Sequence, residues 1–583
     1  MLNLVKKAAQ CLVQDEYDEA IAIYEQAIEA DPTIISNYGK LGLALLLAGR
    51  EEEAQACWLS VLLEGVEDES AELIEILEKE GIQRLEAGKY EQAEKIYCQI
   101  IELAPNYAIA YKNLGNALLN QGKLEDAIAY YQQGLALAPN DAITYYHLGI
   151  VFHQQDKIQE AIDCYQKSLA ISPDSATVFN NLGNAWQRKG KLEEAIACYQ
   201  QSLILDSNQI LTYHNLGSAL NAQGKVDEAL ATFQKALALD PNYVESYHNL
   251  AIFYQDNRQY NEALACCDRA LEIEPNNAEI HWNRALNLLK LGVYEQGFIE
   301  YEWRWQRKNN HPRTLPKPIW NGSDLTGKTI LLQAEQGMGD IIQFIRYIPL
   351  LLEQASKIIV ECHPPLVKLL KTMKGIYKVV AIGEELPEFD VYIPILSLPR
   401  ILKTNLETIP AQIPYLTPLE SVSVQLDKLA KSDFKVGIVW AGNPEHPSDR
   451  RRSSSLHYFI QLLDLPNIAF YSLQKGLKAS EISQISSSLP LIDLSNQINN
   501  FADTAAVITQ MDLVITVDTA VAHLAGALGK PVWVLLCYNS DWRWIIDRDD
   551  TPWYPTMRLF HQNNPGDWQE VLERVRQSLT EFT

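Results

Sequence analysis

The chain has 583 residues, of which 47% are hydrophobic and 21% charged, and its formal net charge is −25 at pH 7. This length exceeds what one hydrophobic core supports, so we expect at least two folded units of ordinary globular composition. Most of the charge lies early in the chain, because residues 1–327 hold 26 Lys and Arg against 46 Asp and Glu. Such a surface excludes nucleic-acid binding there, since phosphate binding needs cationic side chains.

No stretch approaches the roughly 18 consecutive apolar residues of a membrane helix. The N-terminus already has the pattern of an amphipathic hairpin. We therefore predict a cytoplasmic protein with no membrane span and no signal peptide. The nine cysteines include no pair at metal-ligand or redox spacing, which indicates a reducing compartment and no metal site.

The first 308 residues repeat a pattern with a period of 34 residues. A proline or serine marks each repeat at Pro105, Pro139, Pro173, Ser207, Pro241 and Pro275. Small residues form one column at Ala8, Gly42, Gly81, Gly115, Gly149, Gly183, Gly217, Ala251 and Ala285. A second column, twelve residues later, holds Ala20, Ala54, Ala93, Ala127, Ala161, Ala195, Ala229, Ala263 and Gly297. The two columns predict nine closely packed helical hairpins, with a proline ending most of the second helices.

One step breaks the period, because Gly81 follows Gly42 by 39 residues. The five extra residues predict a longer loop or helix end near residues 65–71.

A file of polar residues lies two positions before six of the small residues. It consists of Asn113, His147, Asn181, Asn215, Asn249 and Asn283. Stacked hairpins curve so that the first helices line an inner face, which in such proteins holds extended peptides. A side-chain amide both donates to and accepts from a peptide backbone, so the asparagines are candidate peptide-binding residues. Periodicity alone leaves open that they bond only to neighbouring helices or water.

The repeat, as in Asn113-Leu-Gly with Ala127 and Pro139, resembles the tetratricopeptide repeat. Protein O-linked N-acetylglucosamine transferases also join such a solenoid to a glycosyltransferase, and an asparagine ladder on their inner face contacts the acceptor polypeptide. The resemblance implies a protein or peptide partner in the groove. His147 departs from that ladder.

After residue 308 the pattern changes. Residues 309–327 are rich in proline, glycine and polar residues and predict a linker. A strand over 328–335, a glycine turn and a helix from 341 follow. Further strands are expected at 357–362, 379–382, 390–395, 435–442, 468–474, 491–495, 513–519 and 531–536. This alternation predicts parallel sheets in a short first lobe, residues 328–420, and a second lobe, residues 433–583, with the ligand at the carboxyl ends of strands.

Two glycine-rich or polar turns carry the candidate chemistry. Gly337-Met-Gly339-Asp340 lacks the third glycine of the dinucleotide fingerprint, and no Walker loop is present, which disfavours NAD and ATP enzymes. Asp518-Thr519-Ala520 joins a predicted strand to a helix that carries His523, and amides at a helix N-terminus bind diphosphate well. The alternatives are that the polar residues only cap helices and that His523 is a core histidine.

From about Trp320 to Trp568 the chain resembles the heptosyltransferases, glycosyltransferase family nine, and their relatives with tetratricopeptide repeats. The resemblance is carried by residues 335–347, 436–443, 449–453, 503–505, 518–523 and 541–544. It implies an all-α superhelical solenoid followed by a two-lobed, Rossmann-like α/β domain of the GT-B type. It also implies a nucleotide-sugar as co-substrate, with no bound cofactor or metal.

Residue by residue, Asp340 matches the general base of these enzymes, which deprotonates an acceptor hydroxyl during a single inverting displacement. The resemblance implies donor-binding roles for Gly337, Gly339, Asp518, Thr519, Ala520 and His523. Arg450 and Arg452 stand where related enzymes present a basic residue to phosphate, with a solvated basic loop as the alternative.

We therefore predict a glycosyltransferase that moves a sugar from a nucleotide-sugar to a protein or peptide hydroxyl presented by the solenoid. One alternative acceptor is a polysaccharide or lipid-linked glycan, with the repeats recruiting partners. Another function is a protein-binding scaffold with an inactive domain. The sequence leaves open the sugar, the nucleotide, the acceptor and whether an exposed hairpin pairs with a second copy. It also leaves open whether the late aromatic residues bind sugar or pack.

Overall fold

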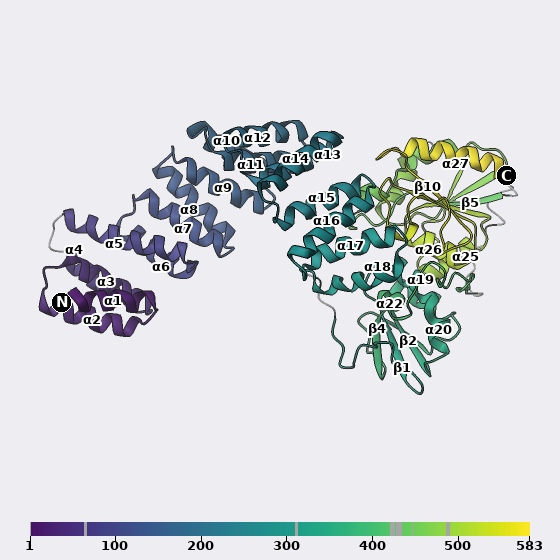
Figure 1. Ribbon diagram of the computed structural model, residues 1–583, viewed down its shortest axis with the longest axis horizontal. Coiled ribbons are helices and arrows are strands. Elements are labelled where there is room, and N and C mark those ends of the chain that lie inside the picture. Colours follow the sequence, from purple (N-terminus) through teal and green to yellow (C-terminus); the bar gives the residue numbers. More distant parts are fainter. Residues whose placement is uncertain are drawn as a thin grey trace. The chain divides into compact units, whose positions relative to one another are not determined.

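The computed structural model describes residues 2–62, 67–308, 310, 313–419, 426, 434–446, 448–484 and 490–582. The chain forms two compact units, Met1–Pro241 and Asn242–Thr583. The predicted class, helical repeats followed by an α/β region with parallel sheets, is confirmed (Figure 1). No helix in the described residues is both long enough and apolar enough to cross a membrane.

The first unit consists of helical hairpins. Its helices are α1 Leu2–Val13, α2 Tyr17–Ala30, α3 Ile35–Leu47, α4 Glu51–Leu62, α5 Glu67–Glu86, α6 Tyr90–Leu103, α7 Ala108–Asn120, α8 Leu124–Leu137, α9 Ala142–Gln154, α10 Ile158–Ile171, α11 Ala176–Arg188, α12 Leu192–Leu205, α13 Ile210–Ala222 and α14 Val226–Leu239. The second helices end just before the repeated prolines, as α8 does before Pro139. Residues 63–66 lie outside the described part. The extra residues lengthen α5, which has 20 residues against 13 in α7.

The glycines of the small-residue column are explained by an aromatic ring in the second helix of the same hairpin. A Cβ at Gly183 would lie 2.5 Å from Cε1 of Tyr199, and one at Gly149 would lie 2.6 Å from Cε1 of Tyr165. Both rings are buried. The glycine therefore lets the ring of α10 or α12 lie against the backbone of its partner helix, which closes the hairpin.

The second unit begins inside the repeats. Its helices α15 Val244–Asp256, α16 Tyr260–Ile273, α17 Ala278–Lys290 and α18 Tyr294–Glu300 form the last two hairpins, and a 3-10 helix, Tyr301–Gln306, follows. Leu289, Tyr294 and Phe298 lie in the same hydrophobic cluster as Trp542 and Trp553 of the α/β region. These hairpins and the α/β region thus share one core. Pro312 of the predicted linker lies outside the described residues.

The first sheet has four parallel strands in the order β3-β2-β1-β4. They are β1 Thr329–Gln333, β2 Lys357–Cys362, β3 Lys378–Ala381 and β4 Val391–Pro394, with helices α19 Met338–Phe344, α20 Ile348–Leu352, α21 Val367–Leu370 and α22 Leu398–Ile401. The neighbours of β1 are β2 on one side and β4 on the other, so the order in which strands are added to the sheet changes side at β1. A ligand-binding crevice is expected at the carboxyl end of such a strand.

The second sheet has six parallel strands in the order β10-β9-β8-β5-β6-β7. They are β5 Phe434–Val439, β6 Ile468–Ser472, β7 Leu491–Asp493, β8 Leu513–Val517, β9 Val532–Leu536 and β10 Met557–His561. Figure 1 shows α27 Trp568–Phe582 on one face and α25 Phe501–Ile508 with α26 Ala520–Ala527 on the other. The order reverses between β5 and β8, which predicts a crevice at their carboxyl ends.

All nine predicted strands are present, and β10 is an additional strand. Arg558 and His561 interrupt its short apolar run, and it pairs only with β9 at the edge of the sheet. Residues 420–425 and 427–433, where the predicted lobes separate, lie outside the described residues.

We predict that Gly183→Ala destabilises the first unit. The new methyl group would meet the buried Tyr199 ring, and such overpacking costs about 1–3 kcal/mol, more than the helix propensity gained by replacing glycine. Urea denaturation followed by circular dichroism should show a lower midpoint. Thr177→Ala, at an exposed position of the same helix, is the matched control and should leave the midpoint unchanged or raise it. A Gly183→Ala midpoint at or above that of the wild type would contradict this explanation of the glycine column.

Candidate functional site

The carboxyl ends of β1 and β8 meet through the helices that follow them. Gly337 caps α19, and Thr519 caps α26. A Cβ at Gly339 would lie 3.1 Å from Cδ2 of His523 and 3.6 Å from Cα of Ala520. A side chain at position 339 would crowd His523, so Gly339 allows the glycine turn of the first sheet to lie close to the start of α26.

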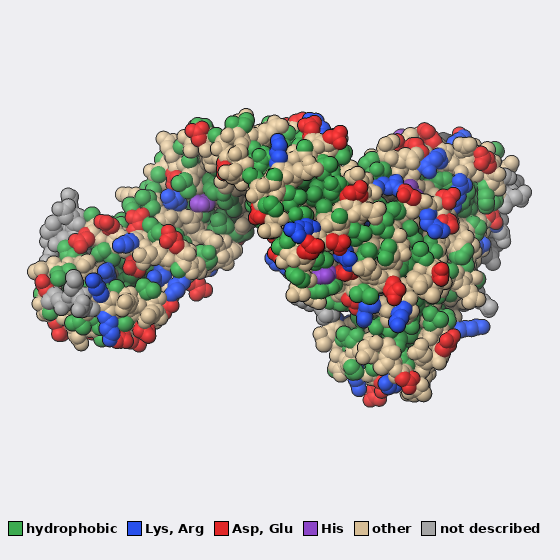
Figure 2. Space-filling model, in the orientation of Figure 1, with side chains coloured by type: hydrophobic (Ala, Val, Ile, Leu, Met, Phe, Trp, Pro, Cys, Tyr) green, Lys and Arg blue, Asp and Glu red, His purple; other side chains and the backbone are tan. Residues whose placement is uncertain are grey.

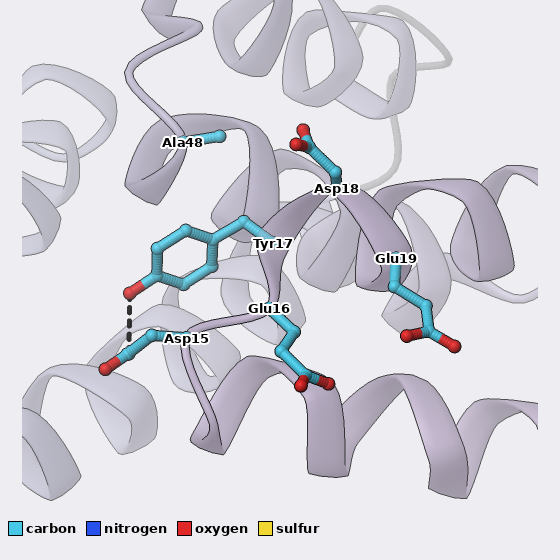
Figure 3. A pocket seen from close by; sticks show the side chains of 6 residues that line it. All are labelled: Asp15, Glu16, Tyr17, Asp18, Glu19 and Ala48. Atoms are coloured by element: carbon cyan, nitrogen blue, oxygen red, sulfur yellow. Dashed lines mark hydrogen bonds between the residues drawn. The ribbon is translucent and has the colours of Figure 1, made fainter.

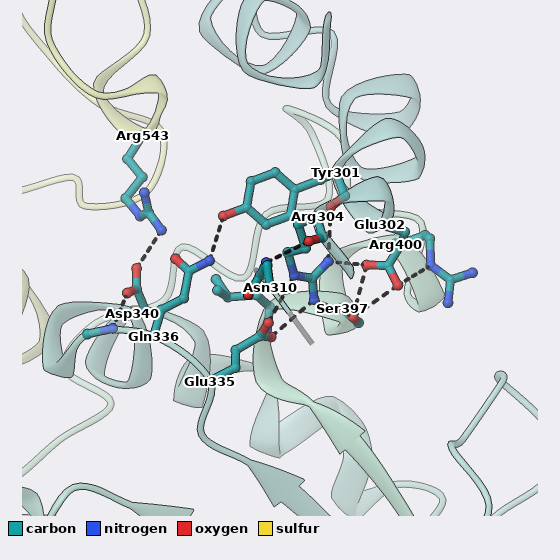
Figure 4. A network of polar contacts seen from close by, with 12 residues as sticks. Tyr301, Glu302, Arg304, Asn310, Glu335, Gln336, Asp340, Ser397, Arg400 and Arg543 are labelled. Atoms are coloured by element: carbon teal, nitrogen blue, oxygen red, sulfur yellow. Dashed lines mark hydrogen bonds and ion pairs between the residues drawn. The ribbon is translucent and has the colours of Figure 1, made fainter. Parts of the chain in front are cut away.

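Asp340 lies in the first turn of α19. Its Oδ2 accepts a hydrogen bond from the Gly337 amide at 2.8 Å, and its Oδ1 accepts from the Arg543 guanidinium. The carboxylate is therefore both a helix cap and half of an ion pair. It faces the second lobe, as Figure 4 shows.

Arg543 links the two sheets. Its guanidinium donates to Asp340, to Oδ1 of Asp541 at 2.8 Å and to Oε1 of Gln343 at 2.9 Å, and its side chain is only 10% exposed. Burial by itself would lower the pKa of Arg543, but the charges of Asp541 and Asp340 outweigh burial and raise it. A permanent positive charge is thus fixed between two carboxylates at the carboxyl edge of both sheets.

Asp518 follows β8 directly and is half-buried. Burial, and then the negative charge of Asp541, raise the pKa of Asp518 to about 6, while Trp544, Arg452 and Arg543 act in the opposite direction. Burial would also raise the pKa of Asp541, but Arg543 holds it below its usual value. Two neighbouring carboxyl groups therefore titrate in different pH ranges.

The three arginines of residues 450–452 occupy different surroundings. Arg452 lies against the backbone after β5, since a Cβ at Gly442 would lie 2.9 Å from its Nη2, and its charge acts on Asp518. Arg451 pairs with Asp256 at 3.3 Å, and Arg450 is exposed. Of the two predicted arginines, the structure brings Arg452 to the carboxyl edge.

His523 is buried inside α26. Its Nδ1 lies 3.1 Å from the hydroxyl of Tyr554, and its ring stacks on Trp544 at 5.2 Å. Burial, followed by the charges of Arg543 and Arg346, lowers the pKa of His523 to about 3. The imidazole is therefore neutral at physiological pH. The Thr519 hydroxyl lies 3.0 Å from that of Thr516.

This arrangement of β8, the Asp-Thr turn, α26 and the Arg543 loop lies in a segment with known relatives. Residues 472–553 match glycosyltransferase family 9 (heptosyltransferase). Residues 14–34, 85–107, 106–174, 174–242 and 220–289 match tetratricopeptide-repeat models. The predicted resemblance to both families is confirmed.

The chain is also similar to protein FlbA of Caulobacter vibrioides, with 27% identity over 334 residues. That match covers 51% of this chain, and it spans about half the length of the relative, 54%. Among solved structures, YrrB, a TPR protein with an unusual peptide-binding site, is 27% identical over 32% of this chain and 95% of its own, with a TM-score of 0.28. MamA from Desulfovibrio magneticus RS-1 is 22% identical over 29% of this chain and 96% of its own, with a TM-score of 0.28.

The first sheet of the α/β region is fastened to the last hairpin by a buried arginine. Arg304 is 1% exposed and donates to both oxygens of Glu335, to Glu302 at 2.7 Å and to Ser397 at 2.8 Å (Figure 4). Glu335 comes immediately before the glycine turn, and Gln336 donates to the Tyr301 hydroxyl at 3.3 Å. The end of the repeats therefore fixes the turn that carries Asp340.

The late aromatic residues pack rather than form an exposed platform. Trp533, Trp542, Trp544, Trp553, Tyr554 and Trp568 are all buried. The Trp553 indole donates to the hydroxyl of Tyr294 at 2.8 Å, and Trp542 meets Phe298 edge-on at 5.7 Å. Several of these rings thus join the last hairpin to the family 9 region.

The predicted asparagines lie in the first helices of their hairpins, and three of them bond to neighbouring helices. Asn113 donates to Tyr97 at 3.2 Å, Asn181 to Tyr146 at 3.3 Å and Asn215 to Asn180 at 2.9 Å. Asn249 and Asn283 occupy the same position in α15 and α17 of the second unit. The amides of Asn113, Asn181 and Asn215 therefore have a structural role. Figure 2 shows acidic side chains spread over the visible face of the repeats.

A hollow of about 350 Å³ in the first hairpins is a different kind of surface (Figure 3). It is lined by Asp15, Glu16, Tyr17, Asp18, Glu19 and Ala48. Four carboxylates repel a diphosphate, so this hollow does not suit a nucleotide-sugar. Cys11, Glu16 and Glu19 place three potential ligand atoms within 4.8 Å of one another, but exposed carboxylates are often grouped in this way.

Arg543 and Asp541 are site residues that our sequence reasoning did not single out. Their signal in the sequence is Asp541-Trp-Arg-Trp, one of the motifs that carry the family resemblance.

We predict that Asp518→Asn stabilises the ligand-free protein at pH 7. Because the pKa of Asp518 rises from 3.8 to about 6 on folding, the native state binds more protons between these values. The free energy of unfolding therefore falls as pH rises through that range. Asparagine does not titrate, so the variant does not lose this stability. Thermal melts should place Asp518→Asn about 2–4 °C above the wild type at pH 7, with the difference shrinking towards pH 4. Asp549→Asn, at an exposed aspartate, is the control; a difference independent of pH would contradict the assignment.

Proposed function

We propose that this protein is a glycosyltransferase that moves a sugar from a nucleotide-sugar to a hydroxyl of a protein or peptide held by the repeats. The observation that best supports this is the meeting of Asp340, Arg543 and the Asp518-Thr519 turn at the carboxyl edge of two parallel sheets. Residues 472–553, which include that turn and Arg543, match glycosyltransferase family 9.

The donor diphosphate would lie at the start of α26. The amides of Thr519 and Ala520 are at the N-terminus of this eight-residue helix, where a negative charge is favoured. Arg452 would add a guanidinium fork for phosphate oxygens. In this arrangement the leaving diphosphate is stabilised by arginine and backbone amides, and we propose that transfer needs no metal ion.

The acceptor hydroxyl would approach Asp340. The hydroxyl oxygen forms its bond to the anomeric carbon as the bond from that carbon to the diphosphate breaks, and this single displacement inverts the configuration. Asp340 takes the proton of the hydroxyl. The Gly337 amide and Arg543 bond to different oxygens of the carboxylate. An ionised carboxylate has about four lone-pair sites, so Asp340 keeps sites that can take the proton.

The neutral ring of His523 would act indirectly. Because its Nδ1 is engaged by Tyr554 and its ring stacks on Trp544, the histidine holds α26 and the residues 541–544 together. In this proposal it sets the place of the donor amides and does not supply positive charge.

The repeats would present the polypeptide acceptor. Tetratricopeptide repeats are a protein-binding architecture, and the file of Asn113, Asn181, Asn215, Asn249 and Asn283 offers donors and acceptors for a peptide backbone. A peptide would have to compete with, or share, the amide bonds to Tyr97, Tyr146 and Asn180. Its acceptor sequence would be read weakly, since backbone contacts carry little sequence information.

We predict that Asn181→Ala, Asn215→Ala and Asn249→Ala together abolish transfer to polypeptide. Three backbone contacts are lost at about 1 kcal/mol each, which amounts to a fall in kcat/KM of about 100-fold or more. The measurement is incorporation of label from a nucleotide-sugar into protein, beside a free glycan acceptor. The matched control changes Asn120, Gln154 and Arg188, the exposed last residues of α7, α9 and α11, to alanine.

Unchanged transfer to polypeptide by the triple variant would contradict the proposed acceptor role of the repeats. Transfer only to the free glycan would favour the polysaccharide or lipid-linked acceptor. No transfer to either acceptor by the wild type would favour the scaffold.

A further inference from the structure

Lys290 is a buried amine with no role in the chemistry described above. It is the last residue of α17 and is 5% exposed. The same repeat position holds Asn120, Gln154 and Arg188, which are exposed, and Asp256, which is half-buried. Burying an ammonium group costs several kcal/mol unless it is paired, so an apolar residue would serve better if the position were only a core site.

The amine is aimed at the loop that follows β9. Its Nζ donates to Oδ1 of Asn539 and lies 5.0 Å from the centre of the Tyr260 ring. The Tyr260 hydroxyl donates to the same Asn539 oxygen at 3.2 Å, and Asn539 Nδ2 donates to Asp256 at 3.3 Å. Three helices of the last two hairpins therefore hold one asparagine side chain.

Asn539 lies two residues before Asp541. The amide of Ile546 donates to the carbonyl of Lys290 at 3.3 Å. Lys290 therefore bonds to both ends of the segment 539–546. Between these contacts lie Asp541 and Arg543, which reach Asp518 and Asp340. Asp256 also pairs with Arg451, beside Arg452 in the loop after β5.

The charges around the amine agree with this geometry. Burial lowers the pKa of Lys290 to about 8, while Asp541, Cys537 and Asp256 act in the opposite direction. The charge that raises the pKa of Lys290 most, against the effect of burial, is thus that of Asp541, a residue of the candidate site.

Resting on the proposed function, we propose that Lys290 is a positioning residue of the donor site, which acts through Asn539 to hold Asp541 and Arg543 in place. The last two hairpins are then part of the catalytic unit and not only an acceptor-binding surface. A shift of about 1 Å in residues 539–546 would misplace Arg543 relative to Asp340, and errors of that size are costly in active sites.

The test uses the full chain and Lys290→Met, which keeps the length of the side chain and removes its donor. Donor binding is measured by thermal-shift titration with UDP-, GDP-, ADP- and dTDP-glucose, and the loop is followed by hydrogen exchange in peptides covering residues 537–546. We expect donor affinity to fall about tenfold and exchange in the loop to rise. Arg188→Met, at the same repeat position in an exposed setting, should change neither.

A double variant separates positioning from general destabilisation. If Lys290 acts through Asn539, Lys290→Met with Asn539→Ala binds donor within about twofold of the weaker single variant, whereas independent effects would multiply. Unchanged loop exchange, or multiplied effects in the double variant, would overturn the proposal. If the wild type binds none of the four probes, the donor function fails, and the exchange comparison still decides whether Lys290 holds the loop.

Discussion

The ion pair between Arg543 and Asp340 is the interaction on which the candidate site depends. Asp340 belongs to the helix after β1 of the first sheet, and Arg543 belongs to the loop after β9 of the second. Placing the carboxyl groups of Asp340, Asp541 and Asp518 together at this half-buried edge would be unfavourable without the Arg543 guanidinium, which pairs with the first two. Arg543 therefore joins the two sheets and sets the electrostatics of the site at once.

A second constraint is the shared core of the last hairpins and the α/β region. Arg304, buried between Glu302 and Glu335, and the bond from Trp553 to Tyr294 tie repeat helices to both sheets. Losing one partner of such a buried pair costs about 3–5 kcal/mol. A fragment that starts after residue 308 would expose this core, so the compact unit that carries the candidate site begins within the repeats.

The regular parts of the fold were predictable because they depend on local periodicity. The glycine column, the strands and the Asp518-Thr519 turn each carry their signal within a few residues, and the structure supplies the reason, such as the Tyr199 ring against Gly183. The predicted arginines divide according to tertiary contacts, with Arg452 at the site and Arg450 exposed. The repeat pattern alone does not reveal that the α/β region packs against the ninth hairpin.

Lys290 and Arg543 illustrate what sequence reasoning cannot reach. Lys290 occupies a repeat position that is exposed in α7, α9 and α11, and it is the contact with the loop after β9 that sets Lys290 apart. Arg543 lies about 200 residues from Asp340, so no spacing rule links them. Similarly, β10 was missed because an edge strand with Arg558 and His561 has little apolar pattern. In each case a long-range contact decides the role of the residue.

The most direct test of the account is Asp340→Asn, which keeps an oxygen for Arg543 but removes the proposed base. The measurement combines single-turnover transfer of the sugar with donor affinity by thermal-shift titration. The account predicts that transfer falls about 100-fold or more while donor affinity stays within about twofold. Turnover equal to that of the wild type would contradict it, because the ion pair at the meeting of the two sheets would then hold a structural carboxylate and not a catalytic one.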